Sequence, residues 1–229
     1  DTDTDTAIQP HTGGPPLVGD LVINEVLADP PSDIGDANCD GLISASQDEM
    51  IELVNVGSTP IDLSGSTVRD AVGVRLAFAA GTVLAPGQVM VVFGGGTPSF
   101  DGGPQAWCDP LPSNVSVAVA PAGLALANSG DTVRVVGWDG ITVLAEMTYG
   151  GSVQDQSLVL QPELQAGTYL GHADVYGQPV SPGRFGDGTA IFVPMDTGLT
   201  AHTGEPPHTG TPVETGDTGV SPFPIVGDV

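Results

Sequence analysis

The sequence predicts an all-β fold, specifically an antiparallel β-sandwich between two low-complexity tails. Apolar segments of about four to eight residues are rich in Val, Ile and Leu and are separated by Gly, Pro, Asn and Asp, which is typical of strands joined by turns. No long segment has the apolar periodicity of a helix. Many short strands without intervening helices favour a sandwich over an α/β fold.

Candidate strands account for most of the centre of the chain. They are residues 21–26, 51–55, 89–93, 115–119, 132–138, 142–149 and 156–160. The segments between them carry turn residues, as in Ala85-Pro86-Gly87-Gln88 and Asn128-Ser129-Gly130-Asp131. Proline presets φ and glycine accepts positive φ, so these segments indicate tight turns and hairpins.

The two ends of the chain differ from this centre. Residues 1–17 begin with an Asp-Thr repeat, and residues 193–229 repeat Thr-Gly beside Asp, Glu, His or Pro. Such segments contain little that can be buried, so folding cannot offset the entropy lost in ordering them. We predict disordered acidic Thr/Gly/Pro-rich linkers at 1–17 and 193–229, around one domain at 18–192 that belongs to a longer exported chain.

The charge balance excludes some classes of partner. Asp and Glu number 28 against 4 Lys and Arg, which gives a formal net charge of -24. Phosphate backbones and anionic lipid surfaces attract basic proteins, so we expect no nucleic-acid partner for this acidic chain. The sequence also has no long apolar run, so we expect no membrane insertion. With so few basic partners, the carboxylates must be solvated, screened or bound to a hard cation.

The two cysteines, Cys39 and Cys108, leave two interpretations open. One disulfide between them would suit an oxidising compartment, and two separate thiols fit the count equally well. The sequence does not decide between these, because a disulfide depends on the geometry of the folded chain.

Residues 36–49 contain the one motif with a strong chemical argument. Asp36-Ala37-Asn38-Cys39-Asp40-Gly41 follows the D-x-N-x-D-G pattern that opens calcium loops of the EF-hand or dockerin type. Oxygen ligands at alternate positions let the chain wrap a hard cation, and glycine permits the sharp turn. The predicted calcium ligands are Asp36, Asn38, Asp40, the carbonyl of Leu42, Ser44 and Asp48.

The loop departs from the motif at its twelfth position. Gln47 stands where a bidentate glutamate is usual, so we assign that role to Asp48 and expect the weaker affinity of extracellular calcium modules. Because no helical pattern flanks the loop, we expect it to connect the first strand to the strand at 51–55. The competing interpretation is a solvated acidic turn, since Asp, Asn and Gly are also turn residues.

Catalysis is not expected from the remaining polar residues. Glu25 and Glu52 lie within apolar strands, where they are better suited to hydrogen-bonding loop backbone or supporting the metal loop than to acid–base chemistry. His172 is the one histidine in the predicted domain, which argues against a zinc tetrad or a Ser-His-Asp triad. The glycines at 94–96 lack a following P-loop lysine, so we interpret them as a loop or bulge.

Several segments resemble a known family. In order they are LVINEV at 21–26, DEMIELVN at 48–55, IDLSG at 61–65, GTVLAPG at 81–87, LANSGDTV at 126–133, QSL at 156–158 and SPG at 181–183. Over residues 18–190 this order resembles the lamin tail domain, here of a bacterial exported type with an EF-hand/dockerin-like calcium loop inserted. The resemblance implies an immunoglobulin-like β-sandwich. The chain has no coiled-coil rod and no basic nuclear-localisation run, so filament assembly and nuclear location are not carried over.

The expected function is that of a non-enzymatic, calcium-stabilised module for adhesion, display or protein interaction. Its expected location is extracellular or in a bacterial cell envelope, with a protein or glycan at a cell surface as partner; the oligomeric state stays open. The alternative is a carbohydrate-binding accessory module of a secreted protein. That alternative needs an exposed aromatic platform, for which the candidates are Trp107, Trp138, Tyr149, Tyr169 and Tyr176.

Overall fold

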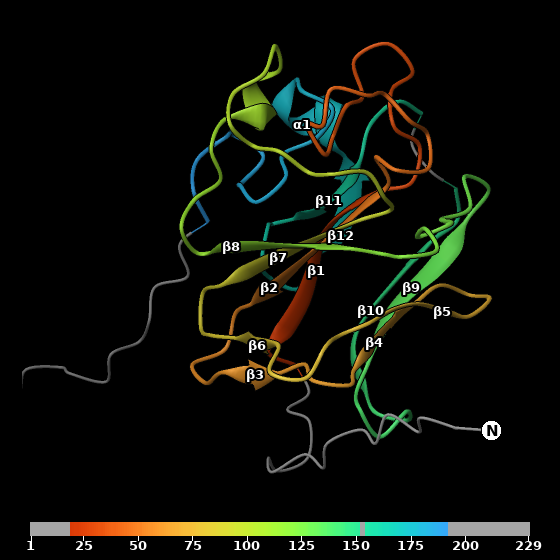
Figure 1. The fold of residues 1–229 in the computed structure, drawn as a ribbon, viewed down its shortest axis with the longest axis vertical. Coiled ribbons are helices and arrows are strands. Elements are labelled where there is room, and N and C mark those ends of the chain that lie inside the picture. The colour runs from red at the N-terminus through yellow and green to blue at the C-terminus, as the bar shows by residue number, and fades with distance from the viewer. Residues whose placement is uncertain (1–18, 152–153, 192–229) are drawn as a thin grey trace, which may run out of the picture. The chain divides into compact units, whose positions relative to one another are not determined.

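The structure, a computed structural model, describes residues 19–151 and 154–191 (Figure 1). The tails predicted at 1–17 and 193–229 lie outside the described residues. The described elements are β1 (Leu21–Leu27), β2 (Met50–Asn55), β3 (Ile61–Asp62), β4 (Thr67–Arg69), β5 (Val74–Ala77), β6 (Val83–Leu84), β7 (Val89–Phe93), the 3-10 helix η1 (Ala106–Cys108), β8 (Val115–Val119), β9 (Asp131–Val136), β10 (Val143–Tyr149), β11 (Leu158–Gln161), β12 (Thr168–Gly171) and the short helix α1 (His172–Tyr176).

These strands form the predicted immunoglobulin-like sandwich. One sheet has the order β12-β11-β1-β2-β7-β8, the second has the order β10-β9-β4-β5, and β3 pairs with β6 in a small third sheet. The pairs within the sheets are antiparallel, except that β7 and β8 run parallel. Figure 1 shows β4, β5, β9 and β10 as a layer beside β1, β2, β7 and β8.

All seven candidate strands of the sequence are present, and the structure adds others. The strands that the sequence did not reveal are β3, β4, β5, β6 and β12, each of two to four residues. A segment this short spans too few residues to display the period-two alternation by which a strand is identified.

The six-stranded sheet is buried on both faces, which explains the continuous apolar runs of its central strands. On β2, Ile51 and Leu53 face the core between the sheets, whereas Met50 and Val54 belong to a second core. This second core includes Trp107 from η1, together with Val180 and Ile191 from the C-terminal part of the described chain. The sheet therefore separates two apolar layers, and a polar group on its second face is sealed from solvent.

The acidic motif connects β1 to β2, as predicted. Within this connection Cys39 forms a disulfide with Cys108 of η1, a residue 69 positions away in the sequence. The structure thus resolves the two interpretations of the cysteines in favour of a single disulfide. No helix in the described part of the chain is long and apolar enough to cross a membrane.

Candidate functional site

The acidic loop at 36–49 folds around its own side-chain oxygens. The two carboxylate oxygens of Asp36 accept hydrogen bonds from the backbone N–H groups of Asp40, at 3.1 Å, and Gly41, at 2.9 Å. Asp40 in turn accepts from the N–H of Leu42 at 2.9 Å. Gly41 has a φ of 87°, so the sharp turn predicted there is present and requires a residue without a Cβ.

Asp48 closes the loop from its far end. Its Oδ1 accepts from the N–H of Asn38 at 3.1 Å, and its Oδ2 accepts from the N–H of Ser44 at 2.7 Å. The residue is fully buried, and burial, together with the charge of nearby Asp36, raises its pKa to about 6 against the opposing effect of its backbone hydrogen bonds. Asp48 therefore joins the two halves of the loop at the cost of an uncompensated buried charge.

The glycine run at 94–96 forms the surface against which the loop packs. A Cβ on Gly94 would lie 2.0 Å from the carbonyl oxygen of Ser46, and a Cβ on Gly96 would lie 2.3 Å from Oδ2 of Asp40. Two hydrogen bonds cross the contact, from Nδ2 of Asn38 to the Gly95 carbonyl and from the N–H of Thr97 to Asp40 Oδ2, both at 3.1 Å. The glycine run is a loop, as interpreted from the sequence. Its glycines allow the acidic loop to pack closely against it, and this contact is a different role from phosphate binding.

A second contact anchors the beginning of the loop. The indole Nε1 of buried Trp107 donates to the backbone carbonyl of Asp36 at 3.1 Å, beside the Cys39–Cys108 disulfide. The loop is therefore fixed to η1 both covalently and by a buried hydrogen bond.

The predicted calcium ligands occupy different environments. Asp36, Asn38 and Asp48 are buried, whereas the Leu42 side chain is 65% exposed and Ser44 accepts from the N–H of Gln47. Across the described ranges, no three His, Cys, Asp or Glu side chains are grouped to hold a metal ion. A calcium site here would depend on carbonyl, amide and hydroxyl oxygens as well as carboxylates, and that oxygen-only donor set is the one calcium takes. Calcium binding stays a prediction.

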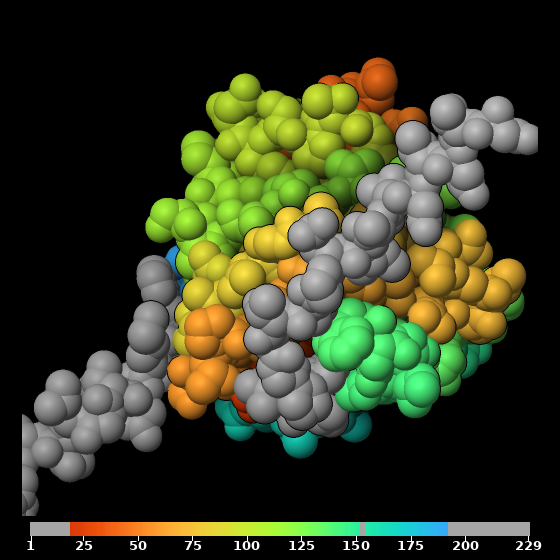
Figure 2. Space-filling model, turned by 60° about the horizontal axis from the view of Figure 1, so that its bottom comes forward, coloured from red at the N-terminus to blue at the C-terminus, as the bar shows by residue number. Residues whose placement is uncertain are grey.

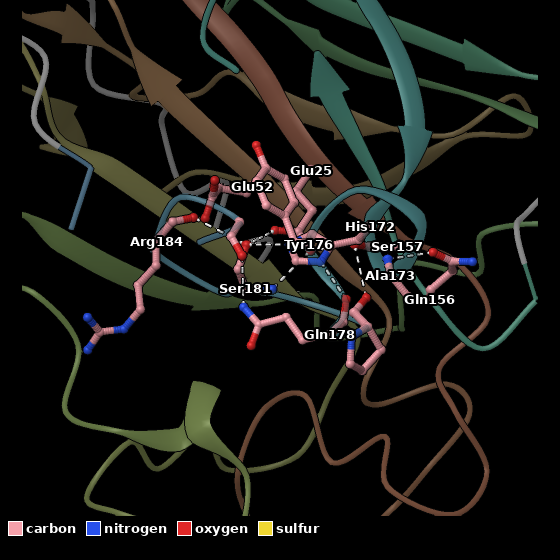
Figure 3. Close-up of polar contacts among 12 residues, drawn as sticks. Glu25, Glu52, Gln156, Ser157, His172, Ala173, Tyr176, Gln178, Ser181 and Arg184 are labelled. Carbon is pink, nitrogen blue, oxygen red and sulfur yellow. Dashed lines mark hydrogen bonds and ion pairs between the residues drawn. The ribbon is translucent and has the colours of Figure 1, made fainter. Parts of the chain in front are cut away.

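A second polar cluster is buried on the outer face of the six-stranded sheet, around Glu25 of β1 (Figure 3). Glu25 is fully buried. Its Oε1 accepts from Ser157 Oγ and from the N–H of Ser181, and its Oε2 accepts from Ser181 Oγ at 2.9 Å. One carboxylate thus ties the segments that contain Ser157 and Ser181 to the first strand.

His172, at the start of α1, completes this cluster. Its Nδ1 lies 2.6 Å from the carbonyl oxygen of Gln178, and a carbonyl only accepts, so Nδ1 carries a proton. Its Nε2 lies 2.8 Å from Ser181 Oγ and 4.0 Å from Glu25 Oε1. Burial raises the pKa of Glu25, although nearby His172 and the hydrogen bonds from Ser157 and Ser181 oppose that rise.

Glu52 of β2 lies directly opposite Glu25 in the register, next to a β-bulge between Ile23 and Glu25. Glu52 is also fully buried; it accepts from Asn24 Nδ2 at 2.9 Å and from the N–H of Gly183 at 2.7 Å. Burial and the neighbouring Glu25 carboxylate raise its pKa well above the ordinary value. The two glutamates hydrogen-bond loop backbone, and this predicted role is confirmed.

Ser181 and His172 have the side-chain atoms of a nucleophile and a base, but their burial and hydrogen bonds differ from those of a catalytic pair. Ser181, which is among the residues lining a hollow of about 220 Å³, is 1% exposed, and His172, which does not line that hollow, is 0% exposed. The Nδ1 of His172 faces a backbone carbonyl, and the Ser181 hydroxyl is bonded to Glu25. A hydrolytic nucleophile must reach a substrate, so this arrangement is suited to holding the C-terminal segment on the sheet.

The buried glutamates predict a pH dependence of stability. A carboxyl whose pKa is raised in the folded state stabilises the fold while protonated, and this contribution is lost as pH rises through the raised pKa. We expect the free energy of unfolding, measured with urea and a chelator, to fall as the pH rises above the ordinary pKa of a glutamate. Glu52→Gln should make that fall smaller, because it removes one of the carboxyl groups whose pKa burial raises. An unchanged pH slope in Glu52→Gln would contradict the assignment.

The fold and this cluster together define an immunoglobulin-like β-sandwich domain whose buried carboxylates accept hydrogen bonds from backbone N–H groups. The sequence model of the lamin tail domain family matches residues 15–151. The chain belongs to the lamin tail domain family, whose members are non-catalytic immunoglobulin-like domains. A comparison with curated proteins gives no match. The matched span includes both Glu25 and Glu52, whereas β11, β12 and α1 follow it.

Sequence reasoning missed that these family motifs meet in space. Glu25, Glu52, Ser157 and Ser181 each lie in a segment that carries the family resemblance, and they converge on one buried cluster. For Glu25 and Glu52 the available signal is a carboxylate within an otherwise apolar strand, whereas the short motifs that contain Ser157 and Ser181 carry no such signal. His172 lies outside those motifs, and its role follows from the structure alone.

Proposed function

We propose that the chain is a non-enzymatic interaction module of an exported or cell-surface protein of a bacterium, stabilised by a disulfide and by calcium. The observation that carries this proposal is the acidic loop. Its buried carboxylates Asp36 and Asp48 receive hydrogen bonds from backbone N–H groups, and no basic side chain of the described residues contacts them. Two buried negative charges near one another destabilise the loop unless a proton or a cation compensates them.

The surroundings of the loop support an extracellular setting. Disulfides persist in oxidising compartments, and the Cys39–Cys108 disulfide joins this loop to η1. Calcium at extracellular concentration fills sites of weak affinity. A bound calcium ion would supply the positive charge that the loop lacks. The oxygens that would hold the ion belong to Asp36, Asn38, Asp40, Leu42, Ser44 and Asp48.

Thermal unfolding of the full chain tests the calcium proposal. With calcium at about 100 times its dissociation constant, linkage gives about 2.7 kcal/mol of stabilisation. For a domain of this size that corresponds to a rise in Tm of about 5–10 °C over the chelated sample. Asp40→Ala should abolish most of the rise, because Asp40 links the loop to Thr97 and is a predicted ligand.

Asp139→Ala is the matched control. Asp139 also accepts hydrogen bonds from its own turn, at the N–H groups of Ile141 and Thr142, but it lies between β9 and β10. We expect the full calcium-dependent rise in this variant. A rise that Asp40→Ala retains in full would show that the ion binds elsewhere, and no rise in the wild type would leave the loop as an acidic turn.

The carbohydrate-binding alternative receives less support from the aromatic residues. Trp138 is 44% exposed, whereas Trp107 and Tyr149 are each 7% exposed. The hydroxyl of Tyr169 donates to the Ile23 carbonyl, and that of Tyr176 donates to Glu163. These rings are bound to their own chain and do not gather into one exposed platform, so we favour protein interaction.

A further inference from the structure

One edge of the six-stranded sheet lacks the features that usually keep a strand from pairing with another chain. The two main sheets have their edges at β12, β8, β10 and β5. β10 carries Glu146 and a bulge between Val143 and Ala145, β5 carries Arg75, and β12 continues directly into α1. Charges, bulges and adjoining helices protect such edges. β8, in contrast, has no charged residue and keeps an unbroken register with β7.

The backbone groups on the free side of β8 belong to alternate residues. The Asn114 carbonyl accepts a hydrogen bond from β7, and the Ala120 N–H donates one to β7. Backbone groups of successive strand residues point to alternate sides, so those of Val115, Val117 and Val119 point away from β7. The N–H of Val115 bonds to the preceding turn. The N–H groups of Val117 and Val119 have no acceptor among the described residues, so another strand can bind them.

The side chains of these valines continue an apolar face of the sheet. In the register with β7, Val117 lies beside Val91 and Val119 lies beside Phe93, and both β7 residues are buried in the second core. Val117 and Val119 themselves are 39% and 36% exposed. Figure 2 shows green residues, the colour that the bar gives to β8, at the surface of the domain. A further strand on this edge would cover the two valines and extend the apolar face.

The sequence of β8 is suited to pairing with itself. The strand reads Val-Ser-Val-Ala-Val, so its pattern is nearly the same in both directions from Val117. In an antiparallel pair with a two-fold axis at Val117, Val119 of each copy lies opposite Val115 of the other. Ser116 then lies opposite Ala118. Valine meets valine on one face and small side chains meet on the other, which makes the edge self-complementary.

The distribution of charge permits this contact. Two copies with a net charge of -24 repel each other, so a contact between them must keep carboxylates apart. Residues 110–130, which include β8, contain no charged residue. Residues 76–100, which include the neighbouring β7, contain none either. A contact along β8 therefore joins uncharged strands of the two copies.

We propose that two copies of this chain pair antiparallel through β8, which joins their six-stranded sheets into one continuous sheet. Val117 of each copy donates its N–H to the Val117 carbonyl of the other copy, and Val119 of each copy donates to the Val115 carbonyl of the other. The pair is closed, because both copies use the same edge. This contact uses no residue of the calcium loop, so it forms whether or not an ion binds there.

Analytical ultracentrifugation of the full chain tests the pairing. We expect a monomer–dimer equilibrium that shifts toward dimer as salt is added, because salt screens the repulsion between two acidic chains. Val117→Lys places two ammonium groups opposite each other at the axis and should raise the dissociation constant about tenfold, which corresponds to about 1.4 kcal/mol. Natural edge strands carry lysine, so this variant should stay folded, and thermal unfolding checks that it does.

Val72→Lys is the matched control. It makes the same change in charge on a side chain that is 87% exposed, in the turn after β4 and away from β8. Exposed substitutions of this kind change free energies little, so the dissociation constant should stay within about twofold of the wild-type value.

A cysteine at the axis tests the register. Opposed residues at a hydrogen-bonded position of an antiparallel pair have Cα atoms about 5.5 Å apart, which a disulfide can span. Val117→Cys should therefore form a covalent dimer on mild oxidation, visible on a non-reducing gel. Val119→Cys should form none, because the two copies of position 119 lie about 13 Å apart along the strands.

Other outcomes would overturn the pairing. A wild type that stays monomeric up to about 1 mM would leave this edge to a strand of a different protein. Equal weakening by Val117→Lys and Val72→Lys would show that the contact does not lie at β8. Equal cross-linking of Val117→Cys and Val119→Cys would exclude the register, and assemblies larger than a dimer would exclude a closed pair.

Discussion

Replacing Cys39 and Cys108 together by alanine is expected to lower the free energy of unfolding by about 4 kcal/mol. The disulfide joins residues 69 positions apart, and the chain-entropy estimate for a loop of that length has this magnitude. The loss should appear as a lower urea midpoint, because the unfolded chain gains freedom while most native contacts persist. Reduction of the wild type under native conditions should produce a similar loss.

The outcome also tests how the acidic loop is held. The hydrogen bond from Trp107 to the Asp36 carbonyl and the packing on Gly94 and Gly96 remain in the double variant. A loss below about 1 kcal/mol would show that these contacts hold the loop without the covalent link. Cys39→Ala alone should match the double variant, provided the free thiol of Cys108 is kept reduced.

Replacing Glu25 by alanine is expected to cost several kcal/mol, because it leaves buried hydrogen-bond donors without an acceptor, at about 1–3 kcal/mol for each unsatisfied group. The change leaves Ser157 Oγ, the Ser181 N–H and the His172 imidazole without their carboxylate, and all three residues are buried. The C-terminal segment that includes Ser181 should then exchange its amide hydrogens faster than in the wild type. Chemical denaturation and hydrogen exchange together measure both effects.

Two further variants separate charge from packing in this prediction. Glu25→Gln keeps the shape of the side chain and one acceptor oxygen, so its cost should be smaller than that of Glu25→Ala. Glu146→Ala removes a glutamate from β10 whose partner, Arg134, is partly exposed, and should cost less than about 1 kcal/mol. Equal losses for Glu25→Ala and Glu146→Ala would contradict the buried network as a source of stability.

The sequence by itself determined the fold class, the family and the connection that carries the acidic motif. The fold class and the acidic connection follow from local signals, because strand periodicity, turn residues and the D-x-N-x-D-G spacing are each contained in a short segment. The family follows from the order of several short motifs along the chain. It also located Glu25 and Glu52 as buried carboxylates serving the backbone, since an acid within an apolar strand must find hydrogen-bond donors.

Only the tertiary structure decided which distant residues meet. The disulfide, the contact of Gly96 with Asp40 and the convergence of Ser157, His172 and Ser181 on Glu25 each join segments separated by many residues. The exposed edge at β8 likewise depends on strand order. Such contacts result from sheet pairing, loop closure and packing of the whole domain. No short segment of the sequence contains both partners, so local patterns carry no record of them.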